Sequence, residues 1–186
     1  MTAPSPREVL FEEGERPRAL PVCDHYSGVE ERMRKSLALQ AEMGPVFDVT
    51  LDNEDGAPAG GEVDHALLIG ELVNGADNLH DRVGARSVQV GHAAFDAVVD
   101  TLVTRAGARL AYLMIPKVGG LADLQRAVAA VDSAARRAGL TREIPLHALV
   151  ETHGALREVF ALAAHPRIES LSFGLMDFVS SHRGAI

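Results

Sequence analysis

The stretch LHALVETHGALREVF, residues 146–160, decides the fold. Its first part is an apolar run that stops on the carboxylate of Glu151, and its second part has the apolar spacing of a helix. A second apolar run, ESLSFGLMDF (169–178), ends near another carboxylate, Asp177, which follows Glu151 by 26 residues. The same order of strand, acidic stop and helix therefore recurs after about one β-α unit.

The composition bounds the class of protein. A chain of 186 residues, 47% of them hydrophobic, predicts one ordinary domain with a sizeable core. The net charge of −8 argues against a nucleic-acid partner, which needs a basic face. The one cysteine, Cys23, cannot form an internal disulfide, which predicts a reduced, cytoplasmic location. No stretch is long enough to span a membrane, and the N-terminus is too charged for a signal peptide.

Apolar periodicity and glycine or proline punctuation divide the rest of the chain into a regular β-α alternation. Residues 1–17 form an N-terminal arm in this interpretation. Short, almost wholly apolar strands indicate a parallel sheet covered on both faces, and six β-α steps fit either a doubly wound open sheet or part of an eight-step barrel. The expected strands are 18–23, 46–51, 85–90, 110–116, 146–151 and 168–174, and the expected helices are 28–44, 62–77, 93–107, 121–139 and 155–165.

Charged residues stand at or just beyond the carboxyl ends of five consecutive expected strands. From Glu54 they follow at intervals of 32, 31, 34 and 26 residues, at Arg86, Lys117, Glu151 and Asp177. Each interval is about one β-α unit, so every step returns to the same end of the sheet, where a parallel barrel holds its active site. Oxygen ligands for a hard divalent cation together with nearby positive charges suit a carboxylate or enolate substrate.

Each charged residue also has an ordinary explanation, because loops between strands are exposed to solvent. Lys117 follows Pro116 and could simply end a strand, and Asp177 could stand at a strand end or at a helix N-cap. His153 has no matching His or Cys partner spacing, which favours a loop role, or a role beside a metal ligand, over direct metal ligation.

Five stretches together resemble one known family: the arginine of RAL (18–20), LDNEDGAP (51–58), IPKVGGLADLQ (115–125), ALVETHGAL (148–156) and IESLSFGLMDF (168–178). Their order and spacing are similar to those of the citrate lyase β-subunit-like family, which includes malyl-CoA and citramalyl-CoA lyases. It belongs to the HpcH/HpaI aldolase group of the phosphoenolpyruvate/pyruvate-binding barrels. The resemblance runs from about Arg18 to Phe178.

The resemblance implies a (β/α)8 TIM barrel, of which about six β-α units are present, and Mg²⁺-dependent chemistry on a carbon–carbon bond. By position it implies that Glu151 and Asp177 are the direct Mg²⁺ ligands and that Glu54 and Asp55 are the family's acidic pair near the metal. It further implies that Arg86 binds the substrate carboxylate and stabilises the enolate, with Lys117 and Arg18 also facing the substrate. The catalytic candidates are thus Arg86, Glu54 and Asp55, and the substrate-binding candidates are Arg18, Arg86 and Lys117.

The chain departs from the family in three places. Val88 stands where the family has an asparagine, and PVCDHYSG (21–28) replaces its usual first strand, which alters the pocket floor. The region 18–186 also lacks the last two β-α units and the C-terminal lid, and six strands cannot close an eight-strand barrel. We expect a longer form of the chain, or other chains, to supply these parts. The resemblance implies a homo-oligomer, a trimer or a hexamer.

The sequence therefore predicts a Mg²⁺-dependent carbon–carbon lyase. Its substrate would be a hydroxyacyl-CoA or a hydroxy or keto acid, cleaved by retro-aldol or retro-Claisen chemistry through a metal-stabilised enolate, with the general base unassigned. Two alternatives are a non-catalytic paralogue acting as a scaffold subunit and a Mg²⁺-binding receiver-like signalling module. The receiver lysine follows the last strand, whereas Lys117 stands mid-chain, which disfavours the second alternative.

Overall fold

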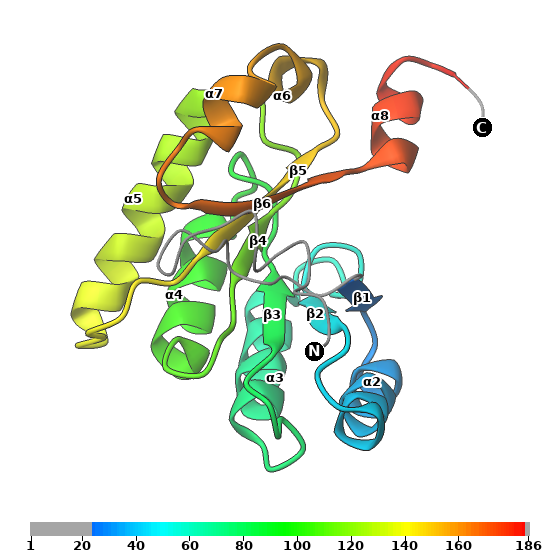
Figure 1. Cartoon of the computed structure of the whole chain (residues 1–186). Helices are drawn as coiled ribbons and strands as arrows, with labels where there is room; N and C mark the ends of the chain where they lie inside the picture. Colours follow the sequence, from blue (N-terminus) through cyan, green and yellow to red (C-terminus); the bar gives the residue numbers. More distant parts are fainter. Residues whose placement is uncertain (1–23, 185–186) are drawn as a thin grey trace, which may run out of the picture.

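The computed structural model describes residues 24–184, and these residues form a single six-stranded parallel sheet that curls into half of a barrel (Figure 1). Each strand pairs with the next strand along the chain, so the order is β1-β2-β3-β4-β5-β6. A doubly wound sheet reverses its strand order at a switch point, which this sheet does not do. The described part of the chain is therefore the barrel-type alternative. The strands are β1 (Asp24–Ser27), β2 (Asp48–Asp52), β3 (Val83–Arg86), β4 (Leu113–Ile115), β5 (Leu146–Val150) and β6 (Ile168–Phe173).

Helices follow every strand, and α2 to α5 cover the outer, convex face of the curled sheet (Figure 1). The longest shows why: α5 buries Leu124, Ala127, Val131 and Ala134, which recur along one face of a 3.6-residue helix. No helix in the described region is long and apolar enough to cross a membrane. The helices are α2 (Glu30–Met43), α3 (Glu62–Asn74), α4 (Phe95–Ala106), α5 (Leu121–Arg137), α6 (His153–Arg157), α7 (Val159–Ala163) and α8 (Leu175–Ser181).

The two faces of the sheet carry different chemistry. Alternate residues of each strand point to opposite faces, and the outward set, such as Ala85, Leu113 and Leu146, joins the main apolar core under the helices. The inward set is largely polar or aromatic. The Tyr112 ring stacks on the His147 ring with 3.8 Å between centroids, and His147 Nε2 lies 3.0 Å from a carboxylate oxygen of Glu169.

The inner face is also tightly filled at its centre. A Cβ atom on Gly84 of β3 would lie 2.3 Å from Cε2 of Tyr112, which is closer than any real side-chain contact. The absence of a side chain at Gly84 therefore lets the Tyr112 ring lie flat against the neighbouring strand. Tyr112 is buried, and this packing fixes the position of its hydroxyl group.

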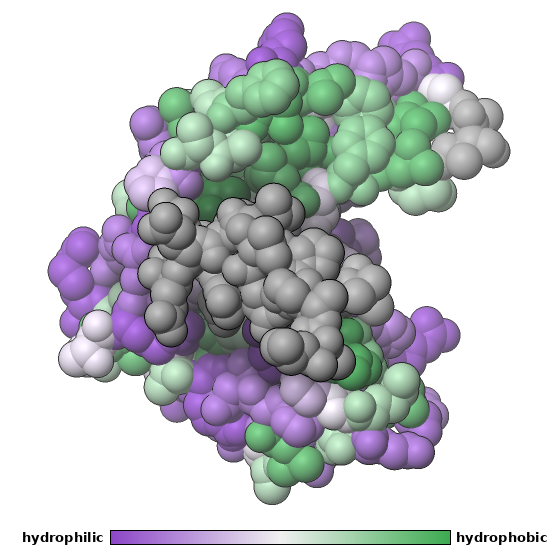
Figure 2. All heavy atoms as spheres, viewed as in Figure 1, coloured by the Kyte–Doolittle hydropathy of each residue, from purple (hydrophilic) through white to green (hydrophobic). Residues whose placement is uncertain are grey.

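The last part of the chain leaves apolar side chains in solvent. Figure 2 shows hydrophobic residues gathered over β6 and α6 to α8, where Phe160 is 88% exposed and Met176 is 72% exposed. β1 and β6 are the two edges of the described sheet. An open edge with exposed apolar neighbours is a surface that folded proteins usually cover.

The sequence predicted most of these elements, with local errors. The strand expected at 85–90 is Val83–Arg86. Val88 lies beyond the strand but is buried in the core, so its apolar side chain gave a false signal of strand structure. The strand expected at 110–116 is only Leu113–Ile115, and the helix expected at 155–165 is two short helices. The strand expected at 18–23 lies outside the described residues, and β1 at Asp24–Ser27 was not predicted.

Replacing Gly84 with alanine tests the packing of the inner face. We expect Gly84→Ala to lower the free energy of unfolding by about 1–3 kcal/mol, because the new methyl group overlaps the buried Tyr112 ring. Urea unfolding followed by circular dichroism measures the change. Gly91→Ala is the matched control, since nothing lies within 4 Å of a Cβ there, and an equal loss in both variants would contradict this account.

Candidate active site

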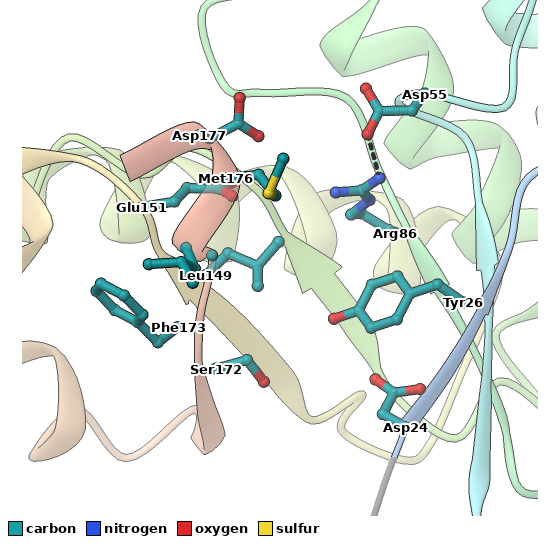
Figure 3. Close-up of a pocket in the computed structure, with 12 residues that line it drawn as sticks. Asp24, Tyr26, Asp55, Arg86, Leu149, Glu151, Ser172, Phe173, Met176 and Asp177 are labelled. Carbon is teal, nitrogen blue, oxygen red and sulfur yellow. Dashed lines mark hydrogen bonds and ion pairs between the residues drawn. The ribbon is translucent and has the colours of Figure 1, made fainter. Parts of the chain in front are cut away.

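A cavity of about 500 Å³ opens at the carboxyl ends of the strands, on the inner face of the half-barrel (Figure 3). This volume is in the range of small-molecule sites. Residues from β1, β3, β5 and β6 and from the loops that follow β2, β5 and β6 line it. The side chains that matter below are those of Asp24, Tyr26, Asp55, Arg86, Glu151 and Asp177.

Arg86, the last residue of β3, is surrounded by three carboxylates. Its Nε and Nη2 atoms each donate to one oxygen of Asp52, both at 2.7 Å, and Nη2 also donates to Asp55 at 2.7 Å. Asp52 and Arg86 are partners in the sheet register, so β2 and β3 bring them together directly. Burial lowers the pKa of the guanidinium and the carboxylates raise it, with a net rise that keeps the group charged.

The remaining guanidinium nitrogen, Nη1, faces the third carboxylate, that of Glu54. Glu54 Oε2 lies 2.9 Å from Nη1 as an ion pair whose geometry is not that of a hydrogen bond. The Asp55 side chain is 68% exposed and can move away without leaving a buried charge unpaired. The guanidinium carbon lies 5.4 Å from the centre of the Tyr26 ring, which forms one wall of the cavity. Arg86 is thus held by three carboxylates, of which the exposed Asp55 is the one that an incoming anion can replace.

Lys117 contacts three acidic residues, which come from the segments after β2, β5 and β6. Its Nζ atom lies 2.7 Å from Glu54 and 3.4 Å from Asp177, and its backbone N–H donates to Glu151 at 2.7 Å. The residue has a φ of 48°, in the left-handed region that side chains other than glycine rarely adopt. Backbone strain of this kind persists only where neighbouring contacts hold it, and it gathers at functional sites.

Glu151 is buried at the end of β5 and lies against the backbone of the next loop. A Cβ atom on Gly174 would lie 2.2 Å from Glu151 Oε2, so only glycine lets the chain pass this carboxylate. Burial raises the pKa of the Glu151 carboxyl, the Lys117 backbone N–H lowers it, and the charges of Glu54 and Asp177 raise it again. Burial likewise raises the pKa of Glu54, against the hydrogen bond from Lys117.

This donor set fits a hard divalent cation. Glu151 and Asp177 line the same cavity and supply carboxylate oxygens, and burial, with the charges of Glu54 and Asp177, raises the pKa of Glu151. The described residues contain no group of three or more His, Cys, Asp or Glu placed to hold a metal. Mg²⁺ suits two carboxylates, because it keeps several water ligands and binds through one or two protein oxygens.

The structure brings most of the predicted site residues together. Glu54, Asp55, Arg86, Lys117, Glu151 and Asp177 form one connected cluster, whereas Arg18 lies outside the described residues. The suggestion that Asp177 is a helix N-cap is wrong, because Gly174 holds that position and Asp177 lies in the first turn of α8.

The loop role predicted for His153 is wrong, because this residue is the first of α6; its Nε2 lies 2.8 Å from Nδ1 of His182, and it does not line the cavity. Sequence reasoning missed two other residues. Asp24 and Tyr26 of β1, which do line the cavity, were not singled out. Their spacing of two residues places them on one face of a strand, but the expected strand had ended at Cys23.

A family model described as HpcH/HpaI aldolase/citrate lyase matches residues 35–185. The chain belongs to this family. A citrate lyase from Burkholderia xenovorans LB400 has a similar structure, with a TM-score of 0.87 and 47% sequence identity over 99% of this chain and 56% of that chain. The L-malyl-CoA/beta-methylmalyl-CoA lyase of Cereibacter sphaeroides is 30% identical over 134 residues, which are 72% of this chain and 42% of that protein.

More distant family-like structures share the fold alone. The citrate lyase beta subunit from M. tuberculosis, solved with oxaloacetate and magnesium, has a TM-score of 0.64 at 20% identity, over 91% of this chain and 65% of that chain. This chain therefore spans between about two fifths and two thirds of the lengths of these relatives. Family membership and the sequential strand order give no support to the receiver-like alternative.

The raised pKa of Glu151 predicts that the ionised Glu151 carboxylate lowers the stability of the folded protein. A carboxyl whose folded pKa is raised stabilises the fold below its ordinary pKa of about 4.5 and loses that contribution as the pH rises through the raised value. We expect Glu151→Gln to raise the unfolding temperature by a few degrees at pH 8 in a chelator, and by less at pH 5. Thermal unfolding of both proteins at the two pH values measures this.

The exposed Glu71 provides the control for this measurement. Glu71→Gln should leave the unfolding temperature unchanged at both pH values. A Glu151→Gln variant that is less stable than the unmodified protein at pH 8 would show that the Glu151 carboxylate is stabilised, not strained, by its surroundings.

Proposed function

We propose that this chain carries the active site of a Mg²⁺-dependent carbon–carbon lyase that acts on a small hydroxy or keto acid or its CoA thioester. The observation that carries the proposal is the convergence of two carboxylates, Glu151 and Asp177, and the side chain of Arg86 on one cavity. The family match and the lyase names of the relatives support the same reaction class.

Glu151 and Asp177 would hold the Mg²⁺. Both are at the carboxyl end of the half-barrel, and the magnesium reported for the M. tuberculosis citrate lyase beta subunit is compatible with this assignment. When bound, Mg²⁺ supplies positive charge next to the substrate oxygen on which an enolate charge develops. Because the pKa of Glu151 is raised without a cation, a bound cation also relieves the repulsion among Glu151, Glu54 and Asp177.

Arg86 would bind the substrate carboxylate in place of the exposed Asp55 and stabilise the developing negative charge. Asp52 and Glu54 hold its guanidinium in one orientation, so the arginine needs no reorganisation during the reaction. Lys117 keeps its charge, since Glu54 and Asp177 raise its pKa against the effect of burial. It would keep Glu54 and Asp177 in place and balance charge at the cavity mouth.

The described sheet has two edge strands, β1 and β6, that no other described strand covers. We propose that the region 18–186 is part of an eight-unit barrel and that two further β-α units cover the β1 and β6 edges of the described sheet. The exposed apolar side chains near β6, including Phe173 and Met176, support this proposal, because such a surface is normally covered. Homo-oligomer formation and a cytoplasmic location stay predictions.

A cleavage assay tests the proposed function. We expect Mg²⁺-dependent release of a keto or acyl product from at least one member of a panel of hydroxyacyl-CoA esters and free hydroxy acids. Glu151→Gln should lower kcat/KM by about 100-fold or more, because it removes a metal ligand. Chelation should remove the activity, and added Mg²⁺ should restore it.

Glu71→Gln again serves as the control and should keep full activity. Unchanged turnover in Glu151→Gln would refute the site assignment. No turnover of any substrate by the unmodified protein would instead support the alternative in which this chain is a non-catalytic scaffold subunit.

A further inference from the structure

Asp177, the second proposed metal ligand, lies on a helix that the core does not hold in place. Helix α8 follows β6 at the end of the described chain (Figure 1), and none of its residues is buried. A helix without buried side chains gains little from the hydrophobic effect, so contacts at its surface must fix its position. The ion pair between Asp177 and Lys117, at 3.4 Å, is one such contact.

Three aromatic rings form the other contact and join α8 to α6. The His153 ring of α6 stacks on the ring of His182, the C-cap residue of α8, with 3.4 Å between centroids and 24° between planes. The Phe178 ring of α8 lies 5.5 Å from the His153 ring and 4.6 Å from the His182 ring, again between centroids. Aromatic rings at such distances attract one another beyond the effect of burying their area. We refer to His153, Phe178 and His182 as the aromatic stack.

His153 is attached to a fixed base, because the residues on both sides of it contact the turn after β4. The hydroxyl of Thr152, the N-cap of α6, donates to the Val118 carbonyl at 2.6 Å. A Cβ atom on Gly154 would overlap the carbonyl oxygen of Gly119, so only glycine lets the two segments approach so closely. The His153 ring therefore projects from a turn whose backbone is held on either side.

The aromatic stack sets the rotation of α8 about its own axis. Neighbouring residues of an α-helix point about 100° apart. With the Phe178 ring packed against α6, Asp177 is directed toward Lys117 and the cavity. His182 holds the far end of the helix, where its Nδ1 atom lies 2.7 Å from the Phe178 carbonyl oxygen. Mg²⁺ requires oxygen ligands at about 2.0–2.1 Å in a nearly octahedral arrangement, so a small rotation of α8 would weaken metal binding by Asp177.

We propose that His153 is a positioning residue for metal binding: through the aromatic stack it holds α8 in the orientation in which Asp177 faces the same cavity as Glu151. This inference rests on the proposed function, which makes Asp177 a metal ligand. His153 does not line the cavity, and it follows Glu151 by two residues. The turn after β5 therefore supplies one metal ligand directly and positions the other through α8.

Calorimetric titration of the substrate-free protein with Mn²⁺, as the probe for Mg²⁺, tests the proposal. His153→Ala removes the ring and should weaken Mn²⁺ binding about tenfold. His153→Phe keeps a ring that can stack on Phe178 and should bind Mn²⁺ within about twofold of the unmodified protein. Because His153 is exposed, the unfolding temperature without metal should change by less than about 2 °C in both variants. A purely structural role would instead lower the unfolding temperature and leave the Mn²⁺ affinity of the folded protein unchanged.

A double-mutant cycle tests whether His153 and His182 act through one stack. His182→Ala alone should weaken Mn²⁺ binding by about the same factor as His153→Ala, and the double variant should be at most about twofold weaker than either. His25→Ala is the matched control and should leave the Mn²⁺ affinity unchanged. His25 also lies near a phenylalanine ring, that of Phe47, at 6.3 Å between centroids, but it belongs to β1 and does not line the cavity.

Asp177→Asn separates this inference from the proposed function. If the protein binds no Mn²⁺, or if Asp177→Asn leaves the affinity unchanged, the proposed metal site fails, and this inference fails with it. If Asp177→Asn weakens binding, an unchanged affinity in His153→Ala overturns the positioning role. Losses that multiply in the double variant, or a His153→Phe variant as weak as His153→Ala, likewise overturn the role of the aromatic stack.

Discussion

The guanidinium of Arg86, held by the carboxylates of Asp52, Glu54 and Asp55, is the interaction on which the mouth of this half-barrel depends. A charge as deeply placed as Arg86 is tolerated only when it is paired and hydrogen-bonded, and removing one partner of such a pair typically costs about 3–5 kcal/mol. Asp52 satisfies this need from the adjacent strand, and the loop after β2 adds the other two carboxylates. The pairing therefore fixes the β2 loop and the direction of Nη1 together.

The carboxylates of Glu151 and Asp177, also at the mouth, have less positive charge nearby than those that surround Arg86. Glu54 and Asp177 contact the ammonium group of Lys117, and Glu151 accepts from the Lys117 backbone N–H, so one positive charge lies among three carboxylates. Burial and this excess of negative charge raise the pKa of Glu151. The fold thus retains an unfavourable arrangement where a cation would make it favourable, which is the usual relation between stability and function at an active site.

The sequence predicted the mouth of the cavity better than its floor. The charged residues recur at regular intervals, each at or just after the end of a strand, and a parallel sheet brings such positions to one end whatever the details of packing. They are Glu54, Arg86, Lys117, Glu151 and Asp177. Asp24 and Tyr26 lie within a short edge strand whose mixed composition gives no apolar alternation. The first strand was therefore expected at 18–23, and these two residues were not predicted to lie in a strand. Contacts such as Tyr112 against Gly84 depend on how neighbouring strands pack, which no local pattern reports.

The most direct test of the central claim is metal binding by Glu151 and Asp177, measured without any substrate. Mn²⁺, which accepts the same oxygen ligands as Mg²⁺ and is visible by electron paramagnetic resonance, is the suitable probe. The account predicts one Mn²⁺ site that Mg²⁺ displaces, with affinity at least about tenfold weaker in Glu151→Gln and in Asp177→Asn, and unchanged in Glu71→Gln. Equal Mn²⁺ affinity in the unmodified protein and in a variant lacking both carboxylates would contradict it.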